Sequence, residues 1–212
     1  MRSMRFHILG CSGGLGGTPG TADRPGHPTR TSSFLVDHDI LVDAGTGVED
    51  LSVEDMRRID HVFLTHSHLD HICALPLMLD TVGSSRERPV VVHALPETIQ
   101  ALKEHIFNWV IWPDFTEIPH FERPWMVYSP LQVGSPVQIG NRTIRPITAI
   151  GSTLPCVHTV FTIFTSSSGL TSVALVTFLA LVAFVTPQLR KRDDILPITI
   201  HKLPLHLAIA LA

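Results

Sequence analysis

Three histidines and one aspartate lie within six positions of the segment THSHLDH, residues 65–71. His66, His68, Asp70 and His71 carry neutral imidazole and carboxylate groups, which are the ligands that suit zinc and related first-row metal ions. A polar loop that happens to be rich in histidine would need no metal. The spacing His-x-His-x-Asp-His directly after an apolar run instead favours a metal site, and an open coordination position there would make the site catalytic.

The apolar run at residues 62–64 predicts a buried strand that leads into this motif. If the end of that strand stays extended, His66 and His68 point to the same side. The last two motif residues then fall on the turn into a helix predicted over residues 72–82. One site could therefore receive two pairs of ligands from two directions.

The segment LTHSHLDHICALPLMLD resembles the metallo-β-lactamase superfamily and, within it, the class II 3′,5′-cyclic nucleotide phosphodiesterases. The segments HILGCSGGLGG, TSSFLV, ILVDAGTGVEDL and HIFNWVIWPDF extend the resemblance from about residue 5 to residue 160. The resemblance implies an α/β (α+β) fold, the metallo-β-lactamase αββα sandwich. It also implies a metal-dependent hydrolase that converts cyclic AMP or cyclic GMP to the nucleoside 5′-monophosphate.

The resemblance implies a two-zinc centre whose ligands are His66, His68, Asp70, His71 and His158. Manganese or ferrous iron could replace zinc. Asp70 would also orient the attacking hydroxide, so it is the catalytic candidate, and Asp43 matches an aspartate that supports the centre from behind its ligands. For Asp43 the alternative is a turn or helix cap. For His158, in the segment LPCVHTV, the alternative is a partly exposed strand or loop histidine without a ligand role.

The family pattern is lost after about residue 160. An aspartate that bridges the two metals is expected after His158, but the stretch TFLAL at residues 177–181 contains no acid. His201 matches a late histidine ligand by its position alone. The sequence therefore predicts a weakened second metal site and weak or absent cyclic phosphodiesterase activity.

Residues 161–212 form an atypical apolar tail behind a predicted domain at residues 1–160, and no charged residue occurs from residue 146 to 189. Three explanations stay open. The stretch 170–186 resembles a membrane span with the positive flank Arg190-Lys191-Arg192. It could instead supply two buried strands of a genuine core, although the sandwich is predicted to be incomplete after about residue 160. A shift of the coding frame would also produce an abrupt change in composition.

Composition narrows the functional classes. The chain has 212 residues, 44% of them hydrophobic, and a formal charge of −3, so it can bury one core and has no basic excess that would favour nucleic acid. Cys11, Cys73 and Cys156 are odd in number and lack CxxC spacing, which argues against a disulfide framework and a thiolate zinc site. The expected partner is a small cyclic nucleotide. The expected compartment is the cytoplasm, with membrane association through residues 170–186 as the alternative.

The same histidine motif also fits other chemistries. A tRNA 3′-end endonuclease, a thioesterase or a lactamase would use the same metal ligands. A non-catalytic remnant or a membrane-tethered module would retain the motif without turnover, as the altered tail allows.

Further elements are predicted around the motif. Apolar runs at residues 33–36 and 40–42 predict a hairpin, residues 89–93 a strand, and residues 96–107 a helix that begins at Pro96. A second hairpin is predicted around Gly140-Asn141. The aromatic stretch 108–121 predicts core packing for Trp109, Trp112 and Phe115, with a wall for a purine base as the alternative.

Overall fold

A computed structural model of the chain describes residues 4–14, 30–148, 159–165 and 172–175. Contacts divide the chain into two compact units. One unit comprises His7–Pro130, and the other comprises Met1–Phe6 together with Leu131–Ala212. Each unit is described by itself below.

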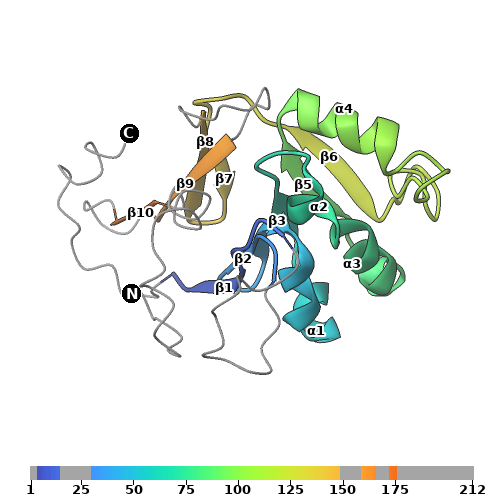
Figure 1. The fold of residues 1–212 in the computed structure, drawn as a ribbon, viewed down its shortest axis with the longest axis horizontal. Coiled ribbons are helices and arrows are strands. Elements are labelled where there is room, and N and C mark those ends of the chain that lie inside the picture. Colours follow the sequence, from blue (N-terminus) through green and yellow to red (C-terminus); the bar gives the residue numbers. More distant parts are fainter. Residues whose placement is uncertain (1–3, 15–29, 149–158, 166–171, 176–212) are drawn as a thin grey trace. The chain divides into compact units, whose positions relative to one another are not determined.

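The larger unit is built on a six-stranded sheet (Figure 1). Its strands, in spatial order, are β1 (Phe6–Gly10), β2 (Ser33–Val36), β3 (Ile40–Ala44), β4 (His61–Phe63), β5 (Val90–Ala94) and β6 (Met126–Pro130). Strands β2 and β3 form the antiparallel hairpin that the sequence predicts, whereas β3, β4, β5 and β6 pair in parallel. The parallel pairing requires the intervening helices as crossovers, as in α/β proteins.

The helices of this unit are η1 (Thr46–Asp50), α1 (Val53–Arg57), α2 (Leu69–Ile72), α3 (Leu75–Val82), η2 (Gly83–Ser85) and α4 (Pro96–His105). Alternate strand residues such as Leu41, Val62 and Val92 share a core with Leu79 of α3 and Leu102 of α4. All of these side chains are at most 1% exposed. The sheet is therefore anchored to its helices by one apolar face, because successive strand residues point to opposite faces.

Two element predictions need correction. The helix predicted over residues 72–82 is two helices, because α2 already begins at Leu69 and ends before the separate helix α3, which carries Pro76 in its first turn. Asp70 and His71 consequently lie on α2 and not on a turn before it. Strand β6 was not predicted. The helix beginning at Pro96 and the strand ending near His93 are confirmed.

The second unit contains a four-stranded antiparallel sheet. Its strands are β7 (Val137–Ile139), β8 (Arg142–Thr148), β9 (Thr159–Thr165) and β10 (Ser172–Leu175), in the spatial order β10-β9-β8-β7. The predicted hairpin turn at Gly140 is confirmed, and the left-handed φ of 60° there suits glycine. Ile144, Phe161 and Ile163 are buried.

The sheet continues across residue 160, where the sequence predicts a domain boundary and a loss of the sandwich. Strand β9 pairs with β8 on both sides of that position, with Val160 opposite Ile147 and Phe161 opposite Pro146. Residues 161–165 and 172–175 therefore contribute strands, and the rest of the tail lies outside the described residues. Within the part of the chain that the structure describes, no helix is long and apolar enough to cross a membrane.

Candidate metal centre

The histidine motif lies where β4 ends and α2 begins. The strand stops at Phe63, and the N–H of Leu64 donates to the carbonyl of His93 on β5 at 2.9 Å. His68 precedes α2 in an extended conformation, with φ −67° and ψ 146°. The motif therefore runs from the carboxyl end of a buried parallel strand into a helical turn, which brings residues 66–71 back over the end of the strand.

The three imidazoles of the motif are close together. The ring centroids of His66 and His68 are 4.5 Å apart, and those of His66 and His71 are 4.1 Å apart. His66 and His71 are buried, at 6% and 8% exposure. The structure thus brings the three imidazoles of the motif together, as the spacing predicts.

Asp43 holds this cluster from below. Its Oδ1 accepts hydrogen bonds from the backbone N–H of Thr65 at 2.8 Å and from the Thr65 hydroxyl at 2.9 Å. Its Oδ2 lies 2.7 Å from Nδ1 of His71. Because a carboxylate only accepts, Nδ1 of His71 carries the proton and Nε2 presents its lone pair. Such a carboxylate–histidine pair fixes the ring orientation and raises the basicity of a metal ligand.

Burial and the neighbouring acids change the pKa of His71 in opposite directions. Burial of the ring works to lower the pKa, but the hydrogen bond to Asp43 and the charges of Asp43 and Asp70 raise it above the ordinary histidine value. The pocket around the ring is therefore electronegative. A cation favours such surroundings, whether it is a proton or a metal ion.

The spacing of Asp70 and His71 fits one metal ion. Oδ2 of Asp70 lies 3.5 Å from Nε2 of His71. Two ligand atoms at bonds of about 2.0–2.1 Å in a tetrahedral site would be separated by roughly 3.4 Å. Among the described residues no group of three or more His, Cys, Asp or Glu side chains is arranged to hold a metal, so the complete coordination sphere stays a prediction. His158 and His201 lie outside the described residues.

Two residues that shape the centre were missed by sequence reasoning. Thr65 bridges Asp43 and the cluster, since its hydroxyl also lies 2.9 Å from Nδ1 of His66. Gly45 lies where the end of β3 meets α2, and a Cβ there would collide with the backbone oxygen of Asp70 and the hydroxyl of Thr31. The signals in the sequence were the threonine that begins the segment THSHLDH and the glycine two positions after Asp43.

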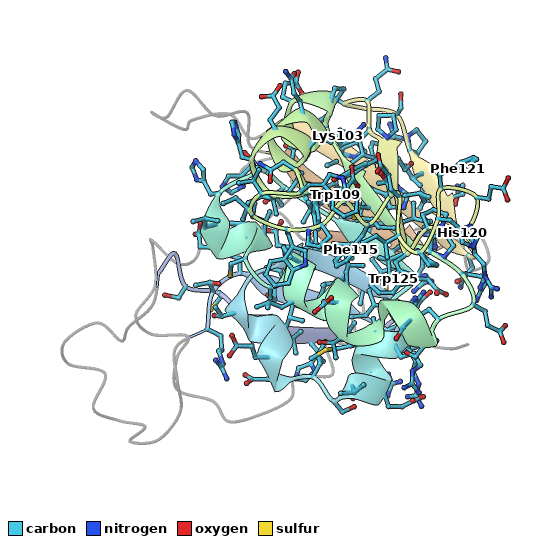
Figure 2. The ribbon with its side chains drawn as sticks, turned by 90° about the vertical axis from the view of Figure 1, so that its right-hand side faces the viewer. Lys103, Trp109, Phe115, His120, Phe121 and Trp125 are labelled. Atoms are coloured by element: carbon cyan, nitrogen blue, oxygen red, sulfur yellow. The ribbon has the colours of Figure 1, made fainter. Side chains whose placement is uncertain are left out.

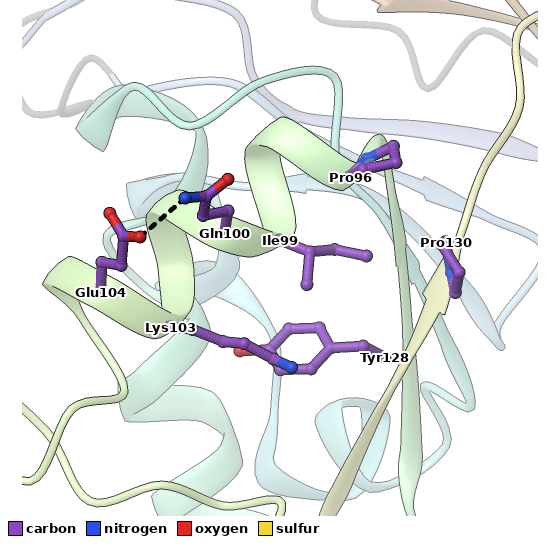
Figure 3. Close-up of a pocket in the computed structure, with 7 residues that line it drawn as sticks. All are labelled: Pro96, Ile99, Gln100, Lys103, Glu104, Tyr128 and Pro130. Atoms are coloured by element: carbon purple, nitrogen blue, oxygen red, sulfur yellow. Dashed lines mark hydrogen bonds between the residues drawn. The ribbon is translucent and has the colours of Figure 1, made fainter.

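A separate pocket of about 510 Å³ lies between α4 and β6 (Figure 3). Its lining residues are Pro96, Ile99, Gln100, Lys103, Glu104, Tyr128 and Pro130. The ammonium group of Lys103 lies 5.3 Å from the centre of the Tyr128 ring. None of the predicted metal ligands lines this pocket.

The family match decides which metal-site proteins this chain is related to. The sequence matches the family described as cAMP phosphodiesterases class-II over residues 50–179, which is more than half of its length. The chain belongs to this family. The match includes the histidine motif and extends past residue 160, into the segment where the sequence pattern was expected to be lost.

Similar solved structures show that the chain has the metallo-β-lactamase fold. The structure of the metallo-β-lactamase fold protein YhfI from Bacillus subtilis matches with a TM-score of 0.54 and 21% identity, over 76% of this chain and 59% of that chain. Unliganded yeast PDE1 matches with a TM-score of 0.61 and 18% identity, over 82% of this chain and 64% of that chain. The predicted fold class is therefore confirmed.

Sequence relatives cover shorter segments. The 3′,5′-cyclic-nucleotide phosphodiesterase 1 of Saccharomyces cerevisiae is 36% identical over 64 residues, 30% of this chain and 17% of the relative. Ribonuclease Z of Clostridium beijerinckii is 33% identical over 113 residues, 49% of this chain and 33% of the relative. All of these matches span less than two thirds of the other protein's length.

Proposed function

We propose that this protein is a metal-dependent phosphodiester hydrolase that acts on 3′,5′-cyclic nucleotides. The observation that carries the proposal is the arrangement of Asp43, His71 and Asp70 at the end of β4, which orients two ligand atoms at a spacing suited to one ion. Membership in the class-II cAMP phosphodiesterases supports this substrate class.

The residues of the chain would divide the work as follows. His66, His68 and His158 would hold one zinc ion, and Asp70 and His71 would help to hold a second. Ions bound there lower the pKa of a bound water and neutralise charge on the attacked phosphate. Asp43 keeps His71 in the correct tautomer, Thr65 keeps both Asp43 and His66 in place, and Asp70 orients the attacking oxygen.

Turnover by this chain is expected to be weak. The stretch at residues 177–181, where the family pattern requires a bridging aspartate, contains no acid. Without that carboxylate the second ion would keep only Asp70 and His71 from the motif. Its affinity should therefore be low, and activity should depend on a high concentration of added metal.

The test is hydrolysis of 3′,5′-cyclic AMP by the full chain with added zinc or manganese. We expect slow turnover that His68→Ala abolishes. The matched control is His105→Ala, which removes an exposed histidine from α4 and should leave the rate unchanged. No turnover at saturating metal would contradict the proposed function in favour of a non-catalytic remnant, and fast turnover would contradict the expected weakness.

A second candidate is the endonuclease reaction at the 3′ end of tRNA precursors. It is favoured by the ribonuclease Z relative, whose match covers more of this chain than that of the yeast phosphodiesterase. The same preparation assayed on a tRNA precursor separates the two. Cleavage of the RNA by wild type, but not by His68→Ala, with no effect on cyclic AMP would favour the endonuclease.

A further inference from the structure

A short loop after α4 exposes three consecutive apolar side chains. Trp109, Val110 and Ile111 are 60%, 84% and 61% exposed. No other two large exposed apolar residues are adjacent in sequence within the described ranges. We call these three residues the apolar tip. Single exposed apolar side chains are common on proteins, but a contiguous group of them more often marks an interaction site.

The backbone of the apolar tip has an unusual conformation. Trp109 has a φ of 64°, in the left-handed region that bulky residues rarely adopt. Glycine would fit this position with less strain. A strained tryptophan that is not buried in the core needs a reason outside the fold, and such outliers concentrate at functional sites.

Asn108 fixes the loop in this conformation. Its Oδ1 accepts hydrogen bonds from the N–H groups of Val110 at 3.0 Å and Ile111 at 2.8 Å, and its Nδ2 donates to the carbonyl of Glu104 at 2.9 Å. The remaining two N–H groups of the loop are also paired, since Trp109 donates to the carbonyl of Trp112 and Trp112 donates to that of Ile106. Every backbone donor from residue 109 to 112 is thus satisfied inside the loop.

Buried aromatic residues support the loop from the core. Phe107 and Phe115 are each 1% exposed, with ring centroids 5.8 Å apart, and Phe115 packs on Trp125 at 5.2 Å. Figure 2 shows Phe115 and Trp125 next to each other. The loop itself joins this cluster through Phe107, which forms a β-bridge with Trp112. The apolar tip is therefore mounted on a rigid base, so that ordering it on binding requires little further loss of conformational freedom.

The histidine motif lies at the carboxyl ends of the parallel strands, and the apolar tip lies toward their amino ends. These two ends of the strands are called the two edges of the sheet below. The parallel strands β4 and β5 lead, at their carboxyl ends, into the motif and into α4. Helix α4 returns to the other edge, where Phe115 accepts a hydrogen bond from the N–H of Met126 at the start of β6. Changes at the tip should therefore leave the metal centre intact.

The size and chemistry of the tip favour a lipid surface over a second protein chain. Its three side chains expose on the order of 400 Å² of largely apolar area, about half of the roughly 800 Å² that each partner of a standard protein interface buries. Tryptophan concentrates at membrane–water interfaces. Backbone donors that are already satisfied can enter a water-poor layer without losing hydrogen bonds. We propose that Trp109, Val110 and Ile111 insert into the interfacial layer of a lipid bilayer and attach this protein to membranes.

The experiment is sedimentation of the full chain with phosphatidylcholine vesicles, with and without phosphatidylserine. We expect wild type to bind, and the triple variant Trp109→Ser, Val110→Ser, Ile111→Ser to bind about tenfold more weakly or not at all. The matched control carries Val53→Ser and Leu77→Ser, two exposed apolar residues on α1 and α3, and should bind as wild type does. Far-ultraviolet circular dichroism checks that all variants are folded.

Two further variants locate the contact. Quenching of tryptophan fluorescence by brominated lipids should decrease in Trp109→Phe although binding is kept, because Trp112 and Trp125 lie deeper. Asn108→Ala should weaken binding although it retains the whole tip, and Asn108→Asp should keep more of it because a carboxylate still accepts the two N–H groups. Equal vesicle binding by wild type and the triple variant, no binding by wild type, or a dimer that only the triple variant abolishes would each overturn the proposal.

Discussion

At both edges of the six-stranded sheet, one side chain accepts hydrogen bonds from backbone N–H groups and so fixes a loop, but the two loops present different groups. At the histidine motif, Asp43 accepts from the backbone N–H of Thr65 and retains an oxygen for His71. At the apolar tip, Oδ1 of Asn108 accepts from two backbone N–H groups, and its Nδ2 donates to the carbonyl of Glu104. The charged Asp43 therefore orients a polar ligand, whereas both polar atoms of the neutral Asn108 bond to backbone groups, so that the loop presents apolar side chains. The bonds that the capping residue makes therefore help to determine which groups each loop presents.

The largest effect is expected from removing Phe115, the central ring of the aromatic cluster beneath the apolar tip. Phe115→Ala should lower the free energy of unfolding by about 3–5 kcal/mol, because a fully buried aromatic leaves a cavity between Phe107 and Trp125. Urea denaturation measures the change. The control Phe121→Ala, at a 75% exposed phenylalanine in the same segment, should change the free energy by less than about 0.5 kcal/mol. Equal effects would mean that the base is not packed as described.

A histidine near the carboxyl end of β5, His93, sharpens the contrast between a histidine that faces an acid and one that faces another histidine. The ring of His93 stacks on Phe63 at 4.2 Å, and its Nε2 lies 3.1 Å from Nδ1 of His61. Burial, and to a lesser degree the charge of His61, lowers the pKa of His93 to about 4. His71, which faces Asp43, differs in having its pKa raised.

The lowered pKa of His93 predicts acid sensitivity. An unfolded histidine has a pKa of about 6.5, so between pH 6.5 and pH 4 the unfolded chain binds more protons than the folded one. Stability should therefore fall as the pH decreases through this window, by roughly 3 kcal/mol from this residue, and level off below it. Urea denaturation at several pH values should give a shallower decline for His93→Gln than for wild type. Identical slopes would contradict the assignment.

The role proposed for Asp43 at the histidine motif can be tested through zinc binding. Asp43→Asn keeps the size of the side chain but removes the charge that orients His71, so zinc affinity should fall about 10–100-fold. Competition with a chromogenic chelator measures the affinity. Asp80→Asn changes an exposed aspartate on α3 and should leave it unaltered. Zinc affinity that is the same in Asp43→Asn and wild type would show that Asp43 does not act on the ligands.

The smallest expected effect concerns the cap of the apolar tip. Asn108→Ala removes three hydrogen bonds at a partly exposed position and should lower the free energy of unfolding by about 1 kcal/mol. Zinc affinity should stay at the wild-type value, because the three hydrogen bonds that this variant loses join only residues 104–111. A loss of zinc binding in this variant would contradict the independence of the edges.

The sequence was informative where interacting residues are adjacent in the chain. His66, His68, Asp70 and His71 could be found because one strand and one turn carry them all. The resemblance was needed to single out Asp43, which lies more than twenty positions away, and Thr65 and Gly45 were missed because their roles depend on the packing of β3 against α2.

The aromatic stretch gave a mixed outcome for a physical reason. Phe115 is in the core as predicted, but the prediction of core packing for Trp109 is wrong, since it is 60% exposed. The spacing of apolar residues predicts which side chains are buried only within helices and strands. Trp109 lies in a loop and has a left-handed backbone conformation, and the sequence pattern does not predict its exposure. Strand β6 was missed because its short apolar run follows a loop of similar composition.

Gly45 has a consequence for genetic variation. Every missense change at its codon adds at least a Cβ, and that atom would meet the backbone of Asp70 and the side chain of Thr31. Neither the backbone nor a residue held by Thr46 can withdraw easily. No single-base missense change at this codon is therefore expected to be neutral, whereas third-base changes are synonymous. In a library of all single-codon variants under selection for function, Gly45 should tolerate as few alternatives as the histidines it supports.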